Sequence, residues 1–197
     1  MNRRQKKLST LPTAGIVWSG EAQSWVPTEH GKMRADRLIE LYRQGKIWAI
    51  AILGGKRSRI TSEAVAYRKY MVAKCPGIES IIVIVNAKEL CSNRDYPAAM
   101  PAIENWLAKN GLSKRTAMIE AVTYKKHFDR IKIVLKSLGF RADNIEWIDS
   151  GESSAYHPLV DGALTLVTRV DPQWRWPLGW FLALIANIQR ISQEKQE

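Results

Sequence analysis

The sequence predicts an α/β protein with a mostly parallel sheet of about five strands and helices on both faces. Apolar runs without alternation, such as IWAIAIL at 47–53 and SIIVIVN at 80–86, are typical of strands that are covered on both faces. Segments with apolar residues at helical spacing separate these runs. Because strands alternate with helices along most of the chain, βαβ crossovers and a parallel sheet are expected.

Each element has its own local signals. The predicted strands are residues 14–19, 47–53, 80–86, 116–122 and 144–148. The predicted helices are residues 31–44, 63–74, 97–109 and 124–138. Thr61 or Ser62 is placed to cap the second helix, and Gly45 and Gly139 to end the first and fourth. Residues 159–170 fit a helix or a strand, and residues 178–191 predict a C-terminal helix that follows a tryptophan-rich stretch and docks on the core.

The 197 residues fit one domain, with residues 1–13 as a basic arm that we expect to be disordered and residues 14–197 as the folded part. Two cysteines, Cys75 and Cys91, form neither a disulfide framework nor a zinc-ligand pattern, which favours a reducing, cytoplasmic setting. The basic start has no apolar run behind it, as a secretory signal would require. No stretch reaches the roughly 18 apolar residues of a membrane span.

The net charge of +11 is unevenly distributed. Residues 109–141 contain nine Lys or Arg against two acidic residues, Glu120 and Asp129. Such a chain suits an anionic small molecule, an acidic membrane surface or nucleic acid. Nucleic acid is the disfavoured partner, because no known nucleic-acid-binding motif is present. Three nearby tryptophans, Trp174, Trp176 and Trp180, keep a membrane-peripheral location as an alternative.

Polar and glycine residues concentrate in the loops that follow the predicted strands. Ligands of open parallel sheets bind at this carboxyl edge, so these loops predict the binding site. The predicted ligand-binding residues are Ser19, Gly20, Gly54, Gly55, Lys56, Arg57, Ser92, Thr123, Lys126 and Arg130. The two glycines before Lys56 and Arg57 would let the backbone approach a phosphate or carboxylate, although no P-loop or dinucleotide fingerprint is present.

Residues 116–139 carry the most specific signal, a strand, a turn and a helix with polar residues at the turn. Thr123 is placed to cap the helix. Lys125 and Lys126 lie in the first turn, where the helix dipole disfavours cations unless an anion docks on the free N–H groups. His127 and Arg130 share one helical face. The alternative interpretation is a solvated basic face with a surface histidine.

Catalysis is left open by the sequence. No metal-ligand pair of histidines and no nucleophile elbow occurs, so we expect no metal site. Glu89 and Asp95 are candidates for an acid and a base, or residues that cap and solvate a loop. His127 is a candidate general acid or base, or a hydrogen-bond donor to an anion.

Several of these residues together resemble the YdcF-like family, which includes the SanA and ElyC envelope-associated groups. The most specific match is threonine, histidine, arginine and a later glycine, at Thr123, His127, Arg130 and Gly139. Further matches are Ser19–Gly20, Arg37, Leu41–Tyr42, Gly54–Gly55, Glu63, Glu89, Ser92 and Asp95. The chain departs from the family pattern at Tyr124, where serine is usual, and in the cations after Gly55.

The resemblance implies a single Rossmann-like domain with its site at the carboxyl edge of the sheet. It implies S-adenosylmethionine or another nucleotide-type cofactor as one candidate ligand, and envelope-related roles for some branches. We therefore expect a protein that binds an anionic small molecule. The alternatives are a peripheral envelope-associated factor and a basic nucleic-acid-binding protein without catalysis.

Overall fold

The protein is built on a five-stranded sheet in which all strands are parallel. The computed structural model describes residues 13–18, 22–23, 26–54, 62–86, 92–151, 158–173, 175 and 181. The strands are β1 (Thr13–Trp18), β4 (Ala49–Leu53), β5 (Ile82–Asn86), β6 (Met118–Thr123) and β7 (Ile145–Asp149). A two-stranded antiparallel pair, β2 (Ala22–Gln23) and β3 (Val26–Pro27), was not expected from the sequence. The predicted fold class is confirmed.

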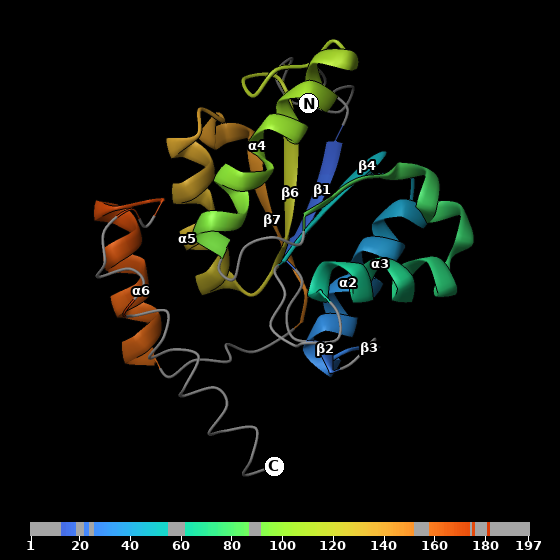
Figure 1. Ribbon diagram of the computed structural model, residues 1–197, viewed down its shortest axis with the longest axis horizontal. Helices are drawn as coiled ribbons and strands as arrows, with labels where there is room; N and C mark the ends of the chain where they lie inside the picture. Colours follow the sequence, from blue (N-terminus) through green and yellow to red (C-terminus); the bar gives the residue numbers. More distant parts are fainter. Residues whose placement is uncertain are drawn as a thin grey trace, which may run out of the picture.

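Helices cover both faces of the sheet (Figure 1). The helices α2 (Glu29–Arg43) and α3 (Glu63–Lys74) lie on one side, and α4 (Ser92–Lys109) and α5 (Lys125–Ser137) on the other. Residues 159–170, which the sequence left open, form the helix α6 (Pro158–Val170). It packs against α5 and lies outside it (Figure 1).

The strand order is β5-β4-β1-β6-β7. The chain starts in the middle with β1, adds β4 and β5 on one side, and then returns to add β6 and β7 on the other. The order therefore reverses between β1 and β6. In an open parallel sheet this switch point is where ligands bind, beyond the carboxyl ends of the strands.

Most element boundaries agree with the predicted ones. The helix α3 has the predicted range, and the Ser62 hydroxyl caps it by accepting a hydrogen bond from the Val65 amide at 3.2 Å. The strand expected over 80–86 begins only at Ile82, because a 3₁₀ helix, η1 (Pro76–Ile81), precedes it. The helix α4 begins at Ser92 and includes both Pro97 and Pro101. Proline is usually excluded from helix interiors, so the sequence placed this start too late.

The turn between β6 and α5 differs from the prediction. Thr123 is the last residue of β6, and the N-cap of α5 is Tyr124, whose side chain makes no capping hydrogen bond. The helix ends near Gly139 as expected, since its φ of +95° is a conformation that favours glycine. A second 3₁₀ helix, η2 (Ala142–Asn144), leads into β7.

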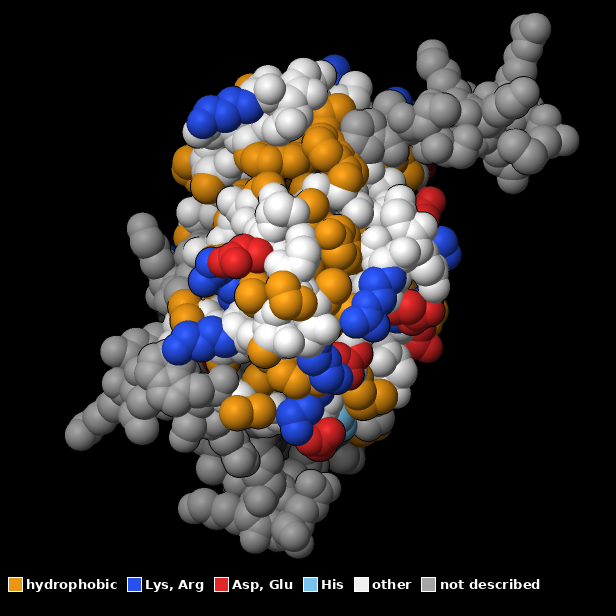
Figure 2. Space-filling model, turned by 90° about the vertical axis from the view of Figure 1, so that its right-hand side faces the viewer, with side chains coloured by type: hydrophobic (Ala, Val, Ile, Leu, Met, Phe, Trp, Pro, Cys, Tyr) orange, Lys and Arg blue, Asp and Glu red, His pale blue; other side chains and the backbone are white. Residues whose placement is uncertain are grey.

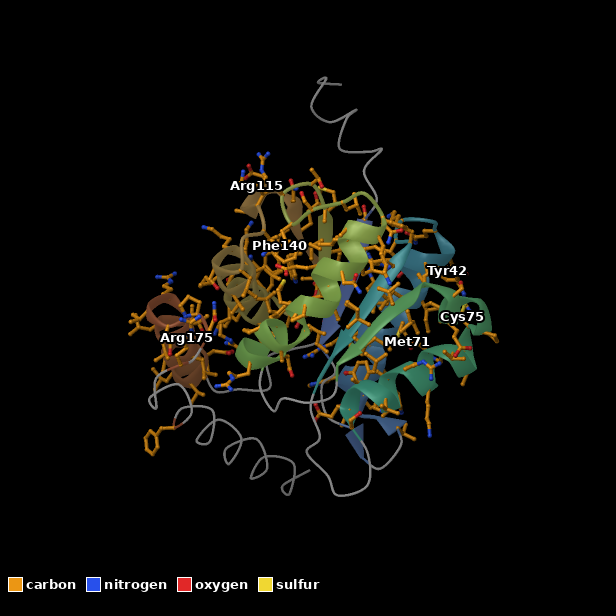
Figure 3. All side chains as sticks on the ribbon, turned by 45° about the horizontal axis from the view of Figure 1, so that its top comes forward. Tyr42, Met71, Cys75, Arg115, Phe140 and Arg175 are labelled. Carbon is orange, nitrogen blue, oxygen red and sulfur yellow. The ribbon has the colours of Figure 1, made fainter. Side chains whose placement is uncertain are left out.

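The sheet separates two apolar cores. One contains Leu38 of α2, Ile50 of β4 and Tyr67 of α3, and Met71 belongs to it (labelled in Figure 3). The other contains Ile119 of β6 and Phe128 of α5, together with residues of α4. Side chains alternate between the two faces along a strand, so β4 contributes Ala51 and Leu53 to one core and Ile50 and Ile52 to the other. The apolar runs without alternation are therefore explained by burial on both faces.

Charged side chains on the side occupied by α3 lie in mixed groups. Figure 2 shows this side, where Lys and Arg alternate with Asp and Glu. Arg68 of α3 pairs with Glu79, and the Lys74 Nζ donates to Asp36 of α2 at 2.8 Å. The described residues of this side therefore form no continuous basic surface. Within the described part of the chain, no helix has the length and apolar character needed to cross a membrane.

Candidate functional site

Buried ionisable side chains gather toward the carboxyl edge of the sheet. Five of the buried Arg, Asp, Glu and His side chains of the described residues lie in the first two turns of α2 to α5: Arg34 in α2, Glu63 in α3, Asp95 in α4, and His127 and Arg130 in α5. The other two, Asp161 and Asp171, lie in the first turn of α6 and directly after that helix. Burying charged groups is costly unless they are paired or hydrogen-bonded. A concentration of such groups at one end of the molecule marks that end as the candidate site.

The centre of this site is the junction of β6 and α5. The Thr123 hydroxyl and His127 Nδ1 form a buried hydrogen bond of 2.9 Å. The Trp147 indole N–H of β7 donates to the Thr123 carbonyl at 2.7 Å and holds the end of β6 against its neighbour. Because Thr123 engages Nδ1, any role of His127 toward a ligand would depend on its other ring nitrogen, Nε2. If Thr123 donates, Nε2 carries the proton; if Thr123 accepts, Nε2 is the basic atom.

Arg130 is tied to α6. Its Nη1 donates to Asp161 Oδ1 at 2.5 Å, and its Nη2 donates to the Tyr124 hydroxyl at 3.2 Å. The side chains of Arg130 and Asp161 are only 7% and 0% exposed. Burial by itself lowers the pKa of the Arg130 guanidinium, but Tyr124 and Asp161 outweigh that effect and raise the pKa above its ordinary value. Arg130 is therefore a fixed, buried cation one turn from His127.

The first turn of α5 carries positive charge and no acidic residue. Lys125 is engaged, since its Nζ donates to Asp129 at 2.8 Å and lies over the rings of Phe128 and Trp147. Lys126 is exposed. The Tyr124 side chain makes no capping hydrogen bond, so the N-cap residue does not compete with an anion for the N–H groups of the first turn.

Other predicted residues lie on the same edge but farther along the sheet. Gly54 is buried directly after β4, and Asp95 is buried in the first turn of α4, after β5. In the strand order, β1 separates β4 from β6, and β5 lies beyond β4. Burial, and secondarily the nearby Asp95 carboxylate, raise the pKa of the Tyr96 hydroxyl well above its ordinary value. Thr123, His127 and Arg130 are thus the predicted residues that the structure brings together.

The remaining predictions fall on residues whose side chains are not described. Ser92 is the first residue of α4, but only its backbone is described. The predicted site residues outside the described part of the chain are Ser19, Gly20, Gly55, Lys56, Arg57 and Glu89. The predicted C-terminal helix and its tryptophans are also outside it, apart from Phe181.

Sequence reasoning missed Arg34 and Asp161. Arg37 was matched to the family arginine, but it pairs with Glu40 on the surface of α2, whereas Arg34 is buried. The spacing from Arg34 to Leu38 and Leu41 places all three on one helical face, and this signal could have identified it. Asp161 is the single carboxylate within an otherwise apolar helical pattern, which is itself a sign of a paired group.

Ser150 is a further residue of interest at this edge. It directly follows β7, whose last residue Asp149 pairs with Thr123 across the sheet. Ser150 is buried, and its hydroxyl has no hydrogen-bond partner among the described residues. A buried hydroxyl without a partner is costly in the absence of a ligand or water.

The described residues contain no group of three or more His, Cys, Asp and Glu side chains that could hold a metal ion. Comparison with known proteins gives no match, whether with family models, curated proteins or solved structures. The resemblance to the YdcF-like family therefore stays a prediction.

Proposed function

We propose that this protein binds an anionic small molecule at the carboxyl edge of its sheet, beside the junction of β6 and α5. The observation that carries the proposal is that five buried ionisable side chains lie in the first two turns of α2 to α5, namely Arg34, Glu63, Asp95, His127 and Arg130. A nucleotide-type ligand, with S-adenosylmethionine as one candidate cofactor, fits this position because such ligands bind at the switch point of doubly wound sheets.

The α5 N-terminus would bind the negative group of the ligand. Its first-turn N–H groups are free of a side-chain cap, and Lys126 adds an exposed cation beside them. His127 would contribute Nε2 as a donor to the anion or as the atom that exchanges a proton with it. The Ser150 hydroxyl is the neighbouring group that a ligand would satisfy.

Arg130 has a different role in this proposal from the direct ligand contact expected from the sequence. Two of its guanidinium N–H groups donate to Asp161 and Tyr124 at 2.5 and 3.2 Å. It would therefore act by fixing Tyr124, the first-turn N-cap residue, and by holding α6 in place. Asp95 and Glu89 remain candidates for holding ligand hydroxyls or for proton transfer.

A thermal-shift screen with inorganic phosphate, ATP, a nucleotide sugar and S-adenosylmethionine tests the proposal. A ligand that binds only the folded state stabilises it by about 2.7 kcal/mol at a concentration a hundred times its Kd, which raises the Tm. His127→Asn keeps a hydrogen-bonding atom near the Nδ1 position and removes Nε2. We expect this variant to fold normally and to lose the shift.

Two lysines of α5 provide the matched control. Lys126→Ala changes the first turn and should weaken binding, whereas Lys136→Ala removes the same charge from the last turn of the same helix and should leave binding unchanged. A ligand-induced shift that persists in both His127→Asn and Lys126→Ala would place the ligand elsewhere. No shift with any of the four compounds, together with salt-sensitive binding to random duplex DNA, would favour the nucleic-acid alternative.

A further inference from the structure

The helix α6 has an exposed apolar face that α5 does not cover. Leu159, Leu166 and Val170 are 77%, 63% and 63% exposed, and Gly162 between them is exposed as well. These four residues, the α6 stripe, recur at intervals of three and four and therefore lie on one side of the helix. Exposed leucines are ordinary when they are scattered, but a continuous apolar stripe indicates a contact surface.

The opposite side of α6 is buried against the domain. Asp161, Leu164 and Thr168 are buried, and Asp161 pairs with Arg130 of α5. α6 is thus held on the domain by its inner side, and the stripe faces outward. Figure 1 shows the helix at the margin of the molecule, outside α5.

The exposed charges near the stripe are positive. The two carboxylates of the region, Asp161 and Asp171, are both buried. The exposed charged side chains of the described residues from 158 onward are Arg169 and Arg175. Arg175 lies beside α6 in Figure 3. Among the described residues from 158 onward, the stripe is thus bordered by cations and by no exposed carboxylate, which makes it complementary to an anionic, partly apolar surface.

The sequence that follows α6 is also rich in residues that suit a membrane interface. Trp174, Trp176 and Trp180 come directly after it, and tryptophan is enriched where protein meets the headgroup region of a bilayer. Phe181 is 59% exposed. We infer that the α6 stripe is a membrane-docking surface, which lies flat on a bilayer containing anionic lipids while Arg169 and Arg175 contact the headgroups.

Vesicle co-sedimentation of the full chain tests this inference. We expect binding to vesicles of phosphatidylcholine and phosphatidylglycerol in equal parts, and much weaker binding to pure phosphatidylcholine. The double variant Leu159→Gln/Leu166→Gln should weaken binding about tenfold or more, because burying each leucine side chain in the bilayer interface contributes favourable free energy to binding. Arg169→Gln should reduce the difference between the two vesicle types.

The control is a second pair of exposed apolar residues away from α6. Val26→Gln/Met33→Gln replaces two exposed apolar residues of β3 and α2 and should leave vesicle binding unchanged. Far-UV circular dichroism checks that both double variants are folded. Equal binding by the two double variants would overturn the inference. A folded protein that binds no vesicles but forms a dimer through Leu159 and Leu166 would overturn it in favour of a second copy of the chain.

Discussion

Arg130 and Asp161 form the pair on which the candidate site depends most directly. Their side chains are almost fully buried. Removing either residue would leave the charge of the other buried without a counter-ion. Deleting one partner of a buried pair typically costs about 3–5 kcal/mol, whereas exposed pairs contribute roughly 0–1 kcal/mol. The sequence predicted Arg130 as a ligand-binding residue on one helical face with His127, and the structure instead pairs it with Asp161.

We therefore predict that Asp161→Asn lowers the free energy of unfolding by about 3 kcal/mol or more, since it leaves Arg130 charged and buried without its counter-ion. Asp129→Asn is the matched control, because it breaks the exposed pair with Lys125 on the same α5 helix. We expect that change to cost about 0.5 kcal/mol or less. Urea denaturation measures both, and equal small effects would show that the buried pair contributes little.

The environment of Glu120 makes the stability of the protein depend on pH. It lies on β6 opposite Glu146 of β7, and its Oε2 is buried without a hydrogen-bond partner among the described residues. Burial, and secondarily the Glu146 charge, raise the pKa of Glu120 above the ordinary 4.5, and Lys46 and Arg37 offset this in part. The folded state then holds a proton that the unfolded state releases. Stability from this group is present below pH 4.5 and is lost as pH rises through the raised pKa.

Glu120→Gln, which stays neutral at every pH, should therefore raise the Tm at pH about 7 and change it little at pH about 4. Thermal unfolding of both proteins at the two pH values measures the difference. The same change in Tm at both pH values would mean that ionisation of Glu120 is not the cause.

At the scale of elements, two glycines within helices face opposite surroundings. A Cβ added to Gly31 of α2 would lie 2.9 Å from Cζ of the buried Tyr67 and 3.0 Å from Cβ of Pro27, and closer still to the Tyr67 hydroxyl. A Cβ at Gly162 of α6 would meet nothing within 4 Å. The first glycine is required by packing between α2 and α3, and the second only lowers helix propensity.

Gly162→Ala should stabilise the protein by about 0.5–1 kcal/mol, the usual gain of alanine over glycine inside a helix. Gly31→Ala gains the same propensity but forces Tyr67 to move in a close-packed core, so we expect net destabilisation of about 1–3 kcal/mol. Chemical denaturation of the two variants measures the contrast. Stabilisation by both substitutions would show that Tyr67 can move to accommodate an added methyl group at little cost in free energy.

At the scale of the whole molecule, one sheet separates two apolar cores and contains the switch point where the strand order reverses. α2 and α3 form a core on one face, and α4 and α5 form a core on the other. The junction of β6 and α5 lies where the strand order reverses, next to β1. The candidate site therefore draws its residues from elements that are distant in the sequence. α6 extends the structure beyond α5 and connects this site to the outward-facing stripe through Asp161.

The local sequence determined the elements of this protein. Runs of apolar residues identified the strands of the sheet, and helical spacing with Ser62 and Gly139 identified the limits of α3 and α5. These signals act over a few residues, because a helix period, a cap or a turn is decided by near neighbours. They also predicted that Thr123, His127 and Arg130 share one junction, since a strand end and the following turn of helix lie close together in any fold.

Only the tertiary structure decided the strand order, the helical state of residues 159–170 and the partners of the buried groups. The pairing of Arg130 with Asp161 joins residues 31 positions apart, and no local pattern specifies such a contact. Arg34 is buried, whereas Arg37 on the same helix is half-buried and pairs with Glu40. The physical reason is that burial and ion pairing depend on which elements become neighbours in space, and that choice is made by the packing of the whole chain.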